Sequence, residues 1–386
     1  MRPLREFLAT ESAGAVLLAG AAVVALLWAN AWPGSYADVL HLPVSLNAGL
    51  RMHFTAQHVV NDALMSVFFL VVGMEIKREL VDGELSSPRQ AALPALAALG
   101  GMVVPAGLYL ALTAGTGDTH AWGIPMATDI ALALGVVVAL GSRVPTGAKV
   151  FLLALAVVDD IGAIVVIAVA YSAGVRWWYL LGALACVAAV AFVARVRPES
   201  TVIVVLLGLL MWRLTYAAGI HATIAGVAMG LLTPTHRIPA LEHRLHPWSS
   251  LVIVPIFAFM NAGVAVDGTA LRAALDSRVA LGVAVGLLVG KPLGILLAVR
   301  LGTRLGLQLP TGVDMPMIAA LGVVAGIGFT VSILVADLAL DHVETVAAAK
   351  IAIIAASTGA AAIGALALRL RSGQLHDEVA LGADGG

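Results

Sequence analysis

Apolar stretches of roughly 20 residues, separated by short polar breaks, recur along the chain from Gly14 to Leu370. A helix of that length crosses the hydrocarbon core of a bilayer, where the backbone must satisfy its own hydrogen bonds. The pattern therefore predicts an all-α integral membrane protein of about twelve transmembrane helices. The predicted spans are residues 13–31, 57–77, 92–113, 123–141, 148–171, 177–195, 200–216, 221–232, 250–267, 278–300, 316–337 and 344–369.

The composition agrees with lipid as the main solvent. Hydrophobic residues make up 61% of the chain and charged residues only 12%, whereas soluble proteins carry about 25% charged residues. The net charge is -1 and there is no basic run, so we expect no nucleic-acid partner. The single cysteine, Cys186, can form no intrachain disulfide.

The start of the chain imitates a secretory signal peptide, because basic residues precede an apolar run that ends at Ala29-Asn30-Ala31. However, the apolar run from Ala13 to Trp28 is long for a signal peptide, and Glu6 and Glu11 lie in the flank that should be positive. We therefore expect an uncleaved first helix.

The distribution of Lys and Arg orients the predicted helices. With the amino terminus inside, fifteen of these residues lie on the inner side and five on the outer side. The positive-inside rule then places both termini in the cytoplasm and favours an even number of helices.

One transmembrane domain, residues 1–371, accounts for most of the chain. The longest break contains residues 44–54, whose loose alternation fits a small outer hairpin or, equally well, an irregular loop. Residues 372–386 form a polar tail that we expect to be disordered and cytoplasmic.

Four of the charged side chains within predicted spans stand in apolar surroundings that place them deep in the membrane: Asp129, Asp159, Asp160 and Lys291. Each costs about 2.5–3.5 kcal/mol at the bilayer centre, so charges at this depth indicate function. Neighbouring residues of a helix point about 100° apart, so Asp159 and Asp160 face different partners. A buried ion-pair network that only fixes helix packing is the structural alternative.

Clustered carboxylates are hard oxygen ligands that bind either an alkali cation or protons. An exchanger requires that the cation and the proton compete for one site. It also requires that the site opens to the other side of the membrane only when one of them is bound. Lys291 would release a proton when a cation arrives, or pair with a carboxylate when the cation leaves.

Two spans have sequences that disfavour a continuous helix. Pro125 follows Gly123 by two residues, and Thr128-Asp129 supplies oxygens typical of a helix start. The eleventh span has glycines at 322, 326 and 328, which would also suit close helix packing. Interrupted helices in spans four and eleven predict inverted-topology repeats formed by spans 3–5 and 10–12.

The chain resembles the NhaA family of bacterial Na+/H+ antiporters almost from end to end. Eight segments in order carry this resemblance: residues 68–80 (FFLVVGMEIKREL), 127–131 (ATDIA), 156–162 (AVVDDIG), 219–226 (GIHATIAG), 245–248 (LHPW), 257–263 (FAFMNAG), 290–294 (GKPLG) and 326–330 (GIGFT). The family implies twelve helices in the cytoplasmic membrane, usually as a homodimer joined by an outer hairpin, with electrogenic export of Na+ or Li+ in exchange for H+.

The resemblance also implies roles for individual residues. Asp160 would be the direct ligand of transported Na+, and Asp159 would share the cation and proton site and pair with Lys291. Asp129 and Lys291 would balance the dipoles of the broken helices, with Thr128 at the site. Activation by alkaline pH would involve Glu75, Arg78, Glu79, His221, Glu242, His243 and His246.

Other function classes fit less well. An intramembrane aspartyl protease should show Gly-x-Gly-Asp within a membrane span, but the one match in this chain, residues 115–118, lies in the break between the third and fourth predicted spans. A channel should show a ring of filter residues. A sodium-coupled solute symporter is the nearest alternative, although no added donors for a solute stand out. We predict a transporter rather than an enzyme, with no cofactor and with membrane lipid as its surroundings.

Overall fold

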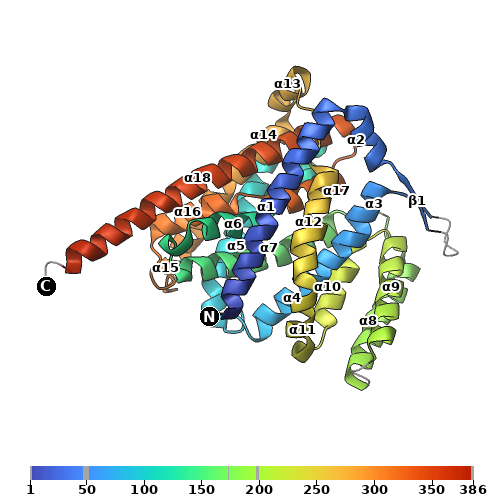
Figure 1. The fold of residues 1–386 in the computed structure, drawn as a ribbon, viewed down its shortest axis with the longest axis horizontal. Helices are drawn as coiled ribbons and strands as arrows, with labels where there is room; N and C mark the ends of the chain where they lie inside the picture. The colour runs from blue at the N-terminus through green and yellow to red at the C-terminus, as the bar shows by residue number, and fades with distance from the viewer. Residues whose placement is uncertain (1, 47–51, 173, 197–199, 384–386) are drawn as a thin grey trace. The chain divides into compact units, whose positions relative to one another are not determined.

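The computed structural model describes residues 2–46, 52–172, 174–196 and 200–383, and helices dominate this part of the chain (Figure 1). The chain forms two compact units. Unit 1 comprises residues 1–16, 84–163 and 266–386, and unit 2 comprises residues 17–83 and 164–265. Two long helices, α1 (Arg2–Ala31) and α7 (Thr146–Ala170), contribute residues to both units.

Unit 1 contains predicted spans 3, 4 and 10–12 and most of span 5. Besides its parts of α1 and α7, its elements are α5 (Pro88–Leu112), η2 (Gly117–Ala121), η3 (Ile124–Met126), α6 (Ile130–Ala139), η4 (Gly141–Arg143), α13 (Gly268–Asp276), α14 (Arg278–Val285), η7 (Gly286–Gly290), α15 (Lys291–Arg304), α16 (Met315–Ala325), α17 (Phe329–Ala339) and α18 (Val343–Ala383). Helix α18 thus continues through most of the tail, and residues 384–386 lie outside the described part.

Unit 2 combines helices with the two strands of the described chain. Its elements are α2 (Pro33–Leu40), β1 (Pro43–Leu46), β2 (Met52–Thr55), α3 (Ala56–Val59), η1 (Val60–Leu64), α4 (Met65–Val81), α8 (Trp177–Val196), α9 (Thr201–Ala217), α10 (Thr223–Leu232), η5 (Thr235–Arg237), α11 (Ile238–Trp248), η6 (Ser249–Ile253) and α12 (Val254–Asn261). The helices α8 and α9 lie side by side in Figure 1.

The membrane prediction is confirmed. In the described part of the chain, eight helical segments are long and apolar enough to cross a membrane, and the bent pair α16–α17 supplies a ninth. Helices α9 and α10 are shorter apolar helices, and the ninth predicted span coincides with η6 and α12. All twelve predicted ranges therefore fall on helical segments of an all-α membrane protein.

The predicted hairpin range overlaps strands β1 and β2. They pair antiparallel, with Pro43 opposite Thr55 and Leu46 opposite Met52. Residues 47–51, between the strands, lie outside the described part of the chain.

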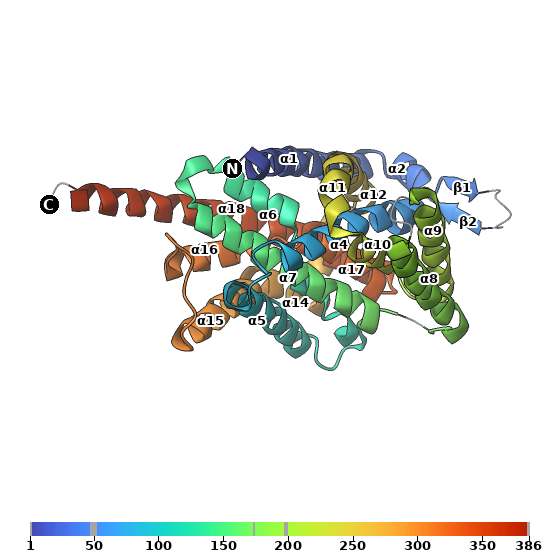
Figure 2. The same cartoon turned by 90° about the horizontal axis from the view of Figure 1, so that it is seen from below.

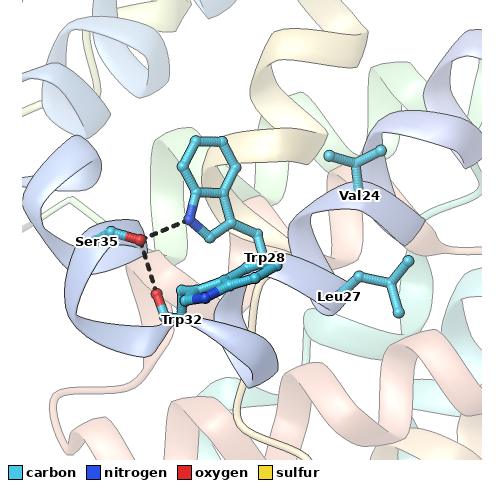
Figure 3. Close-up of a pocket in the computed structure, with 5 residues that line it drawn as sticks. All are labelled: Val24, Leu27, Trp28, Trp32 and Ser35. Atoms are coloured by element: carbon cyan, nitrogen blue, oxygen red, sulfur yellow. Dashed lines mark hydrogen bonds between the residues drawn. The ribbon is translucent and has the colours of Figure 1, made fainter.

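An aromatic turn joins α1 to α2 in unit 2 (Figure 3). The indole of Trp28 donates a hydrogen bond of 2.8 Å to Ser35 Oγ, which donates one of 3.0 Å to the carbonyl of Trp32. The Trp32 side chain is 68% exposed. Amphipathic rings of this kind favour the boundary between lipid and water, so this turn marks one end of the first span.

Glycines allow close helix packing in unit 1. Helices α5 and α15 run side by side (Figure 2), and a Cβ atom on Gly100 would collide with the carbonyl oxygen of Gly294, and the reverse. Small residues let backbones approach in lipid, where no hydrophobic effect drives helices together. Gly107, on the same helix, faces open space.

We expect Gly100→Ala to destabilise the protein by about 1–3 kcal/mol, because the new methyl group overpacks the contact between α5 and α15. Gly107→Ala is the matched control and should be neutral or stabilising by up to about 1 kcal/mol through helix propensity. The apparent melting temperature in detergent measures both. Equal melting temperatures for the two variants would contradict the packing role of Gly100.

Candidate functional site

Both helices predicted to be interrupted are broken in the structure. The fourth span consists of the 3₁₀ turn η3, three extended residues and α6. The eleventh span consists of α16 and α17, which meet at an angle of 48°. Pro125 and the glycines at 326 and 328 lie at the breaks, where they remove a backbone donor or permit close approach of other atoms.

The unwound residues of the two broken spans bond to one another. The backbone N–H of Asp129 donates to the carbonyl of Ile327 at 2.6 Å, and Thr128 Oγ1 donates to the carbonyl of Ala325 at 2.9 Å. Ser332 Oγ donates to the carbonyl of Ile124 at 2.8 Å. Backbone groups that would be unsatisfied in lipid are therefore paired across the crossing.

The Asp129 carboxylate caps the N-termini of two helices. One carboxylate oxygen accepts the N–H of Leu132 in the first turn of α6, at 3.0 Å. The other accepts both the N–H of Thr330 at 3.1 Å and its hydroxyl at 2.7 Å, in the first turn of α17. A carboxylate is favoured at a helix N-terminus, so this buried charge stabilises both half-helices.

Lys291 joins the broken fourth span to α7. Its ammonium group, fully buried, donates to Asp159 Oδ2 at 2.8 Å and to the carbonyl of Met126, the last residue of η3. It follows the π-helical turn η7 at the start of α15. Extra backbone residues of this kind are frequent at functional sites.

The two neighbouring carboxylates of α7 are both buried, with Asp159 1% and Asp160 7% exposed. Asp159 Oδ1 has no hydrogen-bond partner among the described residues, and Asp160 lies close enough to Lys291 to attract it electrostatically. The structure therefore brings Asp159, Asp160 and Lys291 together, and Thr128 and Asp129 line the crossing of the same unit. No group of three or more His, Cys, Asp and Glu side chains suited to a metal ion occurs in the described part.

Unit 2 contains a second charged cluster, centred on Arg78 of α4. Its guanidinium lies 3.8 Å from Glu75 Oε1 and 3.5 Å from Glu79 Oε1, and it pairs with Glu242 of α11. Burial raises the pKa of the Glu242 carboxyl, and the attraction of Arg78 offsets this only in part.

The three histidines predicted for pH regulation occupy different surroundings. His246 acts electrostatically on Glu242, whereas His243 is exposed on α11. His221 lies elsewhere in unit 2, with Nδ1 2.7 Å from Thr223 Oγ1 and Nε2 3.6 Å from Asp62 Oδ1.

Sequence reasoning missed several polar partners. Thr330 and Ser332 are ordinary residues in an apolar span, and only their position at the crossing makes them important. The sequence did offer a signal for Asp62 and for the pair of Asp337 with Lys350. Each of these residues is a charge within a predicted span.

The chain matches one protein family over nearly its whole length. The family model described as Na+/H+ antiporter 1 covers residues 5–368. The chain is 46% identical to the Na(+)/H(+) antiporter NhaA 2 of Myxococcus xanthus, over 95% of this chain and 88% of that protein. It is 45% identical to Na(+)/H(+) antiporters NhaA of Escherichia coli and Shigella boydii, over 96% of this chain and 99% of each relative.

We expect Lys291→Met to destabilise unit 1 by about 3–5 kcal/mol, because it leaves the Asp159 carboxylate buried without its partner. The double variant Lys291→Met with Asp159→Asn removes both charges and should recover most of that loss. Apparent melting temperatures in detergent test this pair of variants. A single variant as stable as the wild type would show that the pair carries no such constraint.

We expect Glu242→Gln to change how stability depends on pH. Because the pKa of Glu242 is raised in the folded protein, the folded state keeps this proton where the unfolded chain has lost it. The contribution of Glu242 to stability is therefore full below its ordinary pKa and is lost as pH rises through the raised pKa.

The melting temperature of Glu242→Gln relative to wild type should accordingly increase with pH across that window. Arg244→Gln, a change at an exposed site on the same helix, is the control and should give a constant difference, because arginine stays charged throughout this pH range. If the melting-temperature difference between Glu242→Gln and the wild type is also independent of pH, the pKa of Glu242 is not raised in the folded protein.

Proposed function

Because the chain belongs to the Na+/H+ antiporter 1 family, we propose that it exports Na+ or Li+ in exchange for protons at Asp159 and Asp160. The observation that carries this proposal is the buried contact of Lys291 with Asp159, which leaves Asp159 Oδ1 without a partner. A carboxylate in this state is ready to accept a cation or a proton. The named relatives are antiporters for the same two ions.

Competition at these carboxylates gives the exchange. A cation that binds Asp160 and Asp159 takes over the role of the Lys291 ammonium as the positive partner of Asp159. Lys291 or a carboxyl group then releases a proton, because one buried site cannot keep both positive charges close together. Proton binding on the other side of the membrane restores the pair of Lys291 with Asp159 and expels the cation.

The crossing of the two broken spans supports alternating access. Thr128 and Asp129 hold the half-helices together through the bonds described above, so that the two breaks move as one body. Lys291 lies at the C-terminal end of η3, and Asp129 lies at the N-termini of α6 and α17. These charges oppose the dipoles of the half-helices, as the inverted-repeat transporters are known to require.

The exchange is electrogenic when more protons enter than sodium ions leave. Each net charge moved per cycle is then coupled to the membrane potential at about 2.3 kcal/mol per 100 mV.

The protein would lie in the cytoplasmic membrane with both termini inside, as the distribution of basic residues indicates. Strands β1 and β2 would join two copies as a homodimer.

The cluster around Arg78 is our candidate for pH regulation. Three carboxylates, from Glu75, Glu79 and Glu242, surround one guanidinium, so full ionisation leaves an excess of negative charge and favours retention of a proton. Loss of that proton as pH rises would change the attraction between α4 and α11. His246 would add to this response, and His221 and His243 would contribute from outside the cluster.

The test is a pH-gradient assay in everted membrane vesicles. Addition of Na+ or Li+ should dissipate an acid interior for the wild type, and Asp160→Asn should abolish the response because it removes an ionisable ligand. Asp38→Asn, at an exposed position of α2, is the control and should retain full activity. Activity of Asp160→Asn equal to wild type would refute the site, and a need for an added solute would favour a symporter.

A further inference from the structure

Unit 1 contains a second buried carboxylate and lysine pair, away from the site described above. Lys350 Nζ of α18 lies 2.7 Å from Asp337 Oδ1 of α17, and Lys350 is only 7% exposed. Asp337 Oδ2 is buried and has no hydrogen-bond partner among the described residues. Asp159 has the same arrangement, with one oxygen on a lysine and the other without a partner.

The pair lies on the helix that starts at the crossing. The N–H of Phe329 donates to Ser357 Oγ of α18 at 3.2 Å, so α17 and α18 run antiparallel and are joined near both ends of α17. Asp337 follows Thr330 by seven residues, which places it about 10 Å further along the helix. The proposed topology directs this end of α17 toward the outside.

A buried oxygen without a partner has a physical cost. A carboxylate oxygen without a hydrogen-bond donor is less stable than one that is satisfied, so it recruits water, a proton or a cation. The Asp337 side chain as a whole retains 20% exposure although its Oδ2 atom is buried, so a proton that reaches the exposed part of the carboxyl group needs only a short transfer to Oδ2. If the pair of Asp337 with Lys350 served only helix packing, we would expect both carboxylate oxygens of Asp337 to have hydrogen-bond partners.

Lys350 is the only described residue that forms a hydrogen bond or ion pair with the Asp337 side chain. The other charged or titratable groups on neighbouring segments are Asp118 and His120 of η2, Asp341 and His342 of the following loop, and Glu344 at the start of α18. Proton binding at Asp337 is therefore governed chiefly by burial and by Lys350.

We propose that Asp337, held by Lys350, is a second proton-binding site that loads protons from the outer side during exchange. A proton from outer water binds Asp337 Oδ2, giving a carboxylic acid beside the Lys350 ammonium. The acid later returns this proton to water on the path toward Asp159 and Asp160, and the ion pair with Lys350 forms again. This inference rests on the proposed antiport function.

The experiment measures uptake of radioactive Na+ into everted vesicles, whose lumen corresponds to the outer side. The lumenal pH is varied at constant external pH, so that only outer proton loading changes. Asp337→Asn should lower the apparent affinity for lumenal protons roughly tenfold, a shift of about one pH unit toward acid. The rate with a strongly acid lumen should remain that of the wild type.

Two variants are controls. Asp337→Glu keeps a titratable carboxyl and should restore most of the wild-type pH profile. Asp341→Asn removes an exposed carboxyl four residues away and should leave the profile unchanged. Because Asp337→Asn leaves Lys350 without its partner and could impair folding, Asp337→Asn with Lys350→Met removes both charges and should show the same acid shift.

The outcomes are distinct. A profile unchanged in Asp337→Asn, or a rate lowered equally at every lumenal pH, overturns the proposal, since the second result indicates only a structural ion pair. Failure of the wild type to exchange Na+ for protons instead refutes the antiport function on which the proposal rests.

Discussion

Hydrocarbon offers no hydrogen bonds, so every charge and every unwound peptide group inside the bilayer must find its partner within the protein. Asp129 shows how this constraint organises the fold. Its two carboxylate oxygens accept bonds from the first turns of both α6 and α17. One buried charge therefore stabilises the starts of two half-helices where the broken spans cross.

The same constraint explains why a salt bridge can work as a switch. A buried ion pair contributes little net stability, because the cost of desolvating both charges offsets their attraction, yet loss of one partner is costly. The contact of Lys291 with Asp159 can therefore be exchanged for a contact with a cation at small net cost. It cannot simply be broken. In the mechanism that we propose, this asymmetry would couple arrival of the cation to the release of positive charge from the site.

Sequence analysis predicts the features that neighbouring residues determine, but not the contacts between residues far apart in the chain. The predicted spans and the breaks at Pro125 and Gly326 follow from local composition, and the structure contains them. The partners of the buried charges depend on residues far apart in the chain. Thr330 and Ser332, like the carbonyl of Met126, carry no sequence pattern of their own.

Two other misses have a different cause. Asp62 and Asp337 are charges within predicted spans, and each lies near a span end, from which a polar side chain can ordinarily reach the membrane surface. The structure instead buries polar atoms of Asp337 against α18. The position of a residue along a predicted span therefore does not show whether its side chain is buried, because neighbouring helices can shield a group that is close to the membrane surface.

Helix α7 has a special place in this arrangement. It carries Asp159 and Asp160 a few residues before Ala163, where unit 1 gives way to unit 2. The candidate ion site lies wholly in unit 1, whereas the charge cluster of Arg78 lies in unit 2. Because α7 is one continuous helix, its backbone hydrogen bonds hold both carboxylates at fixed positions along it. The pair can therefore change its partners only by rotation of the two side chains or by movement of the helix as a whole.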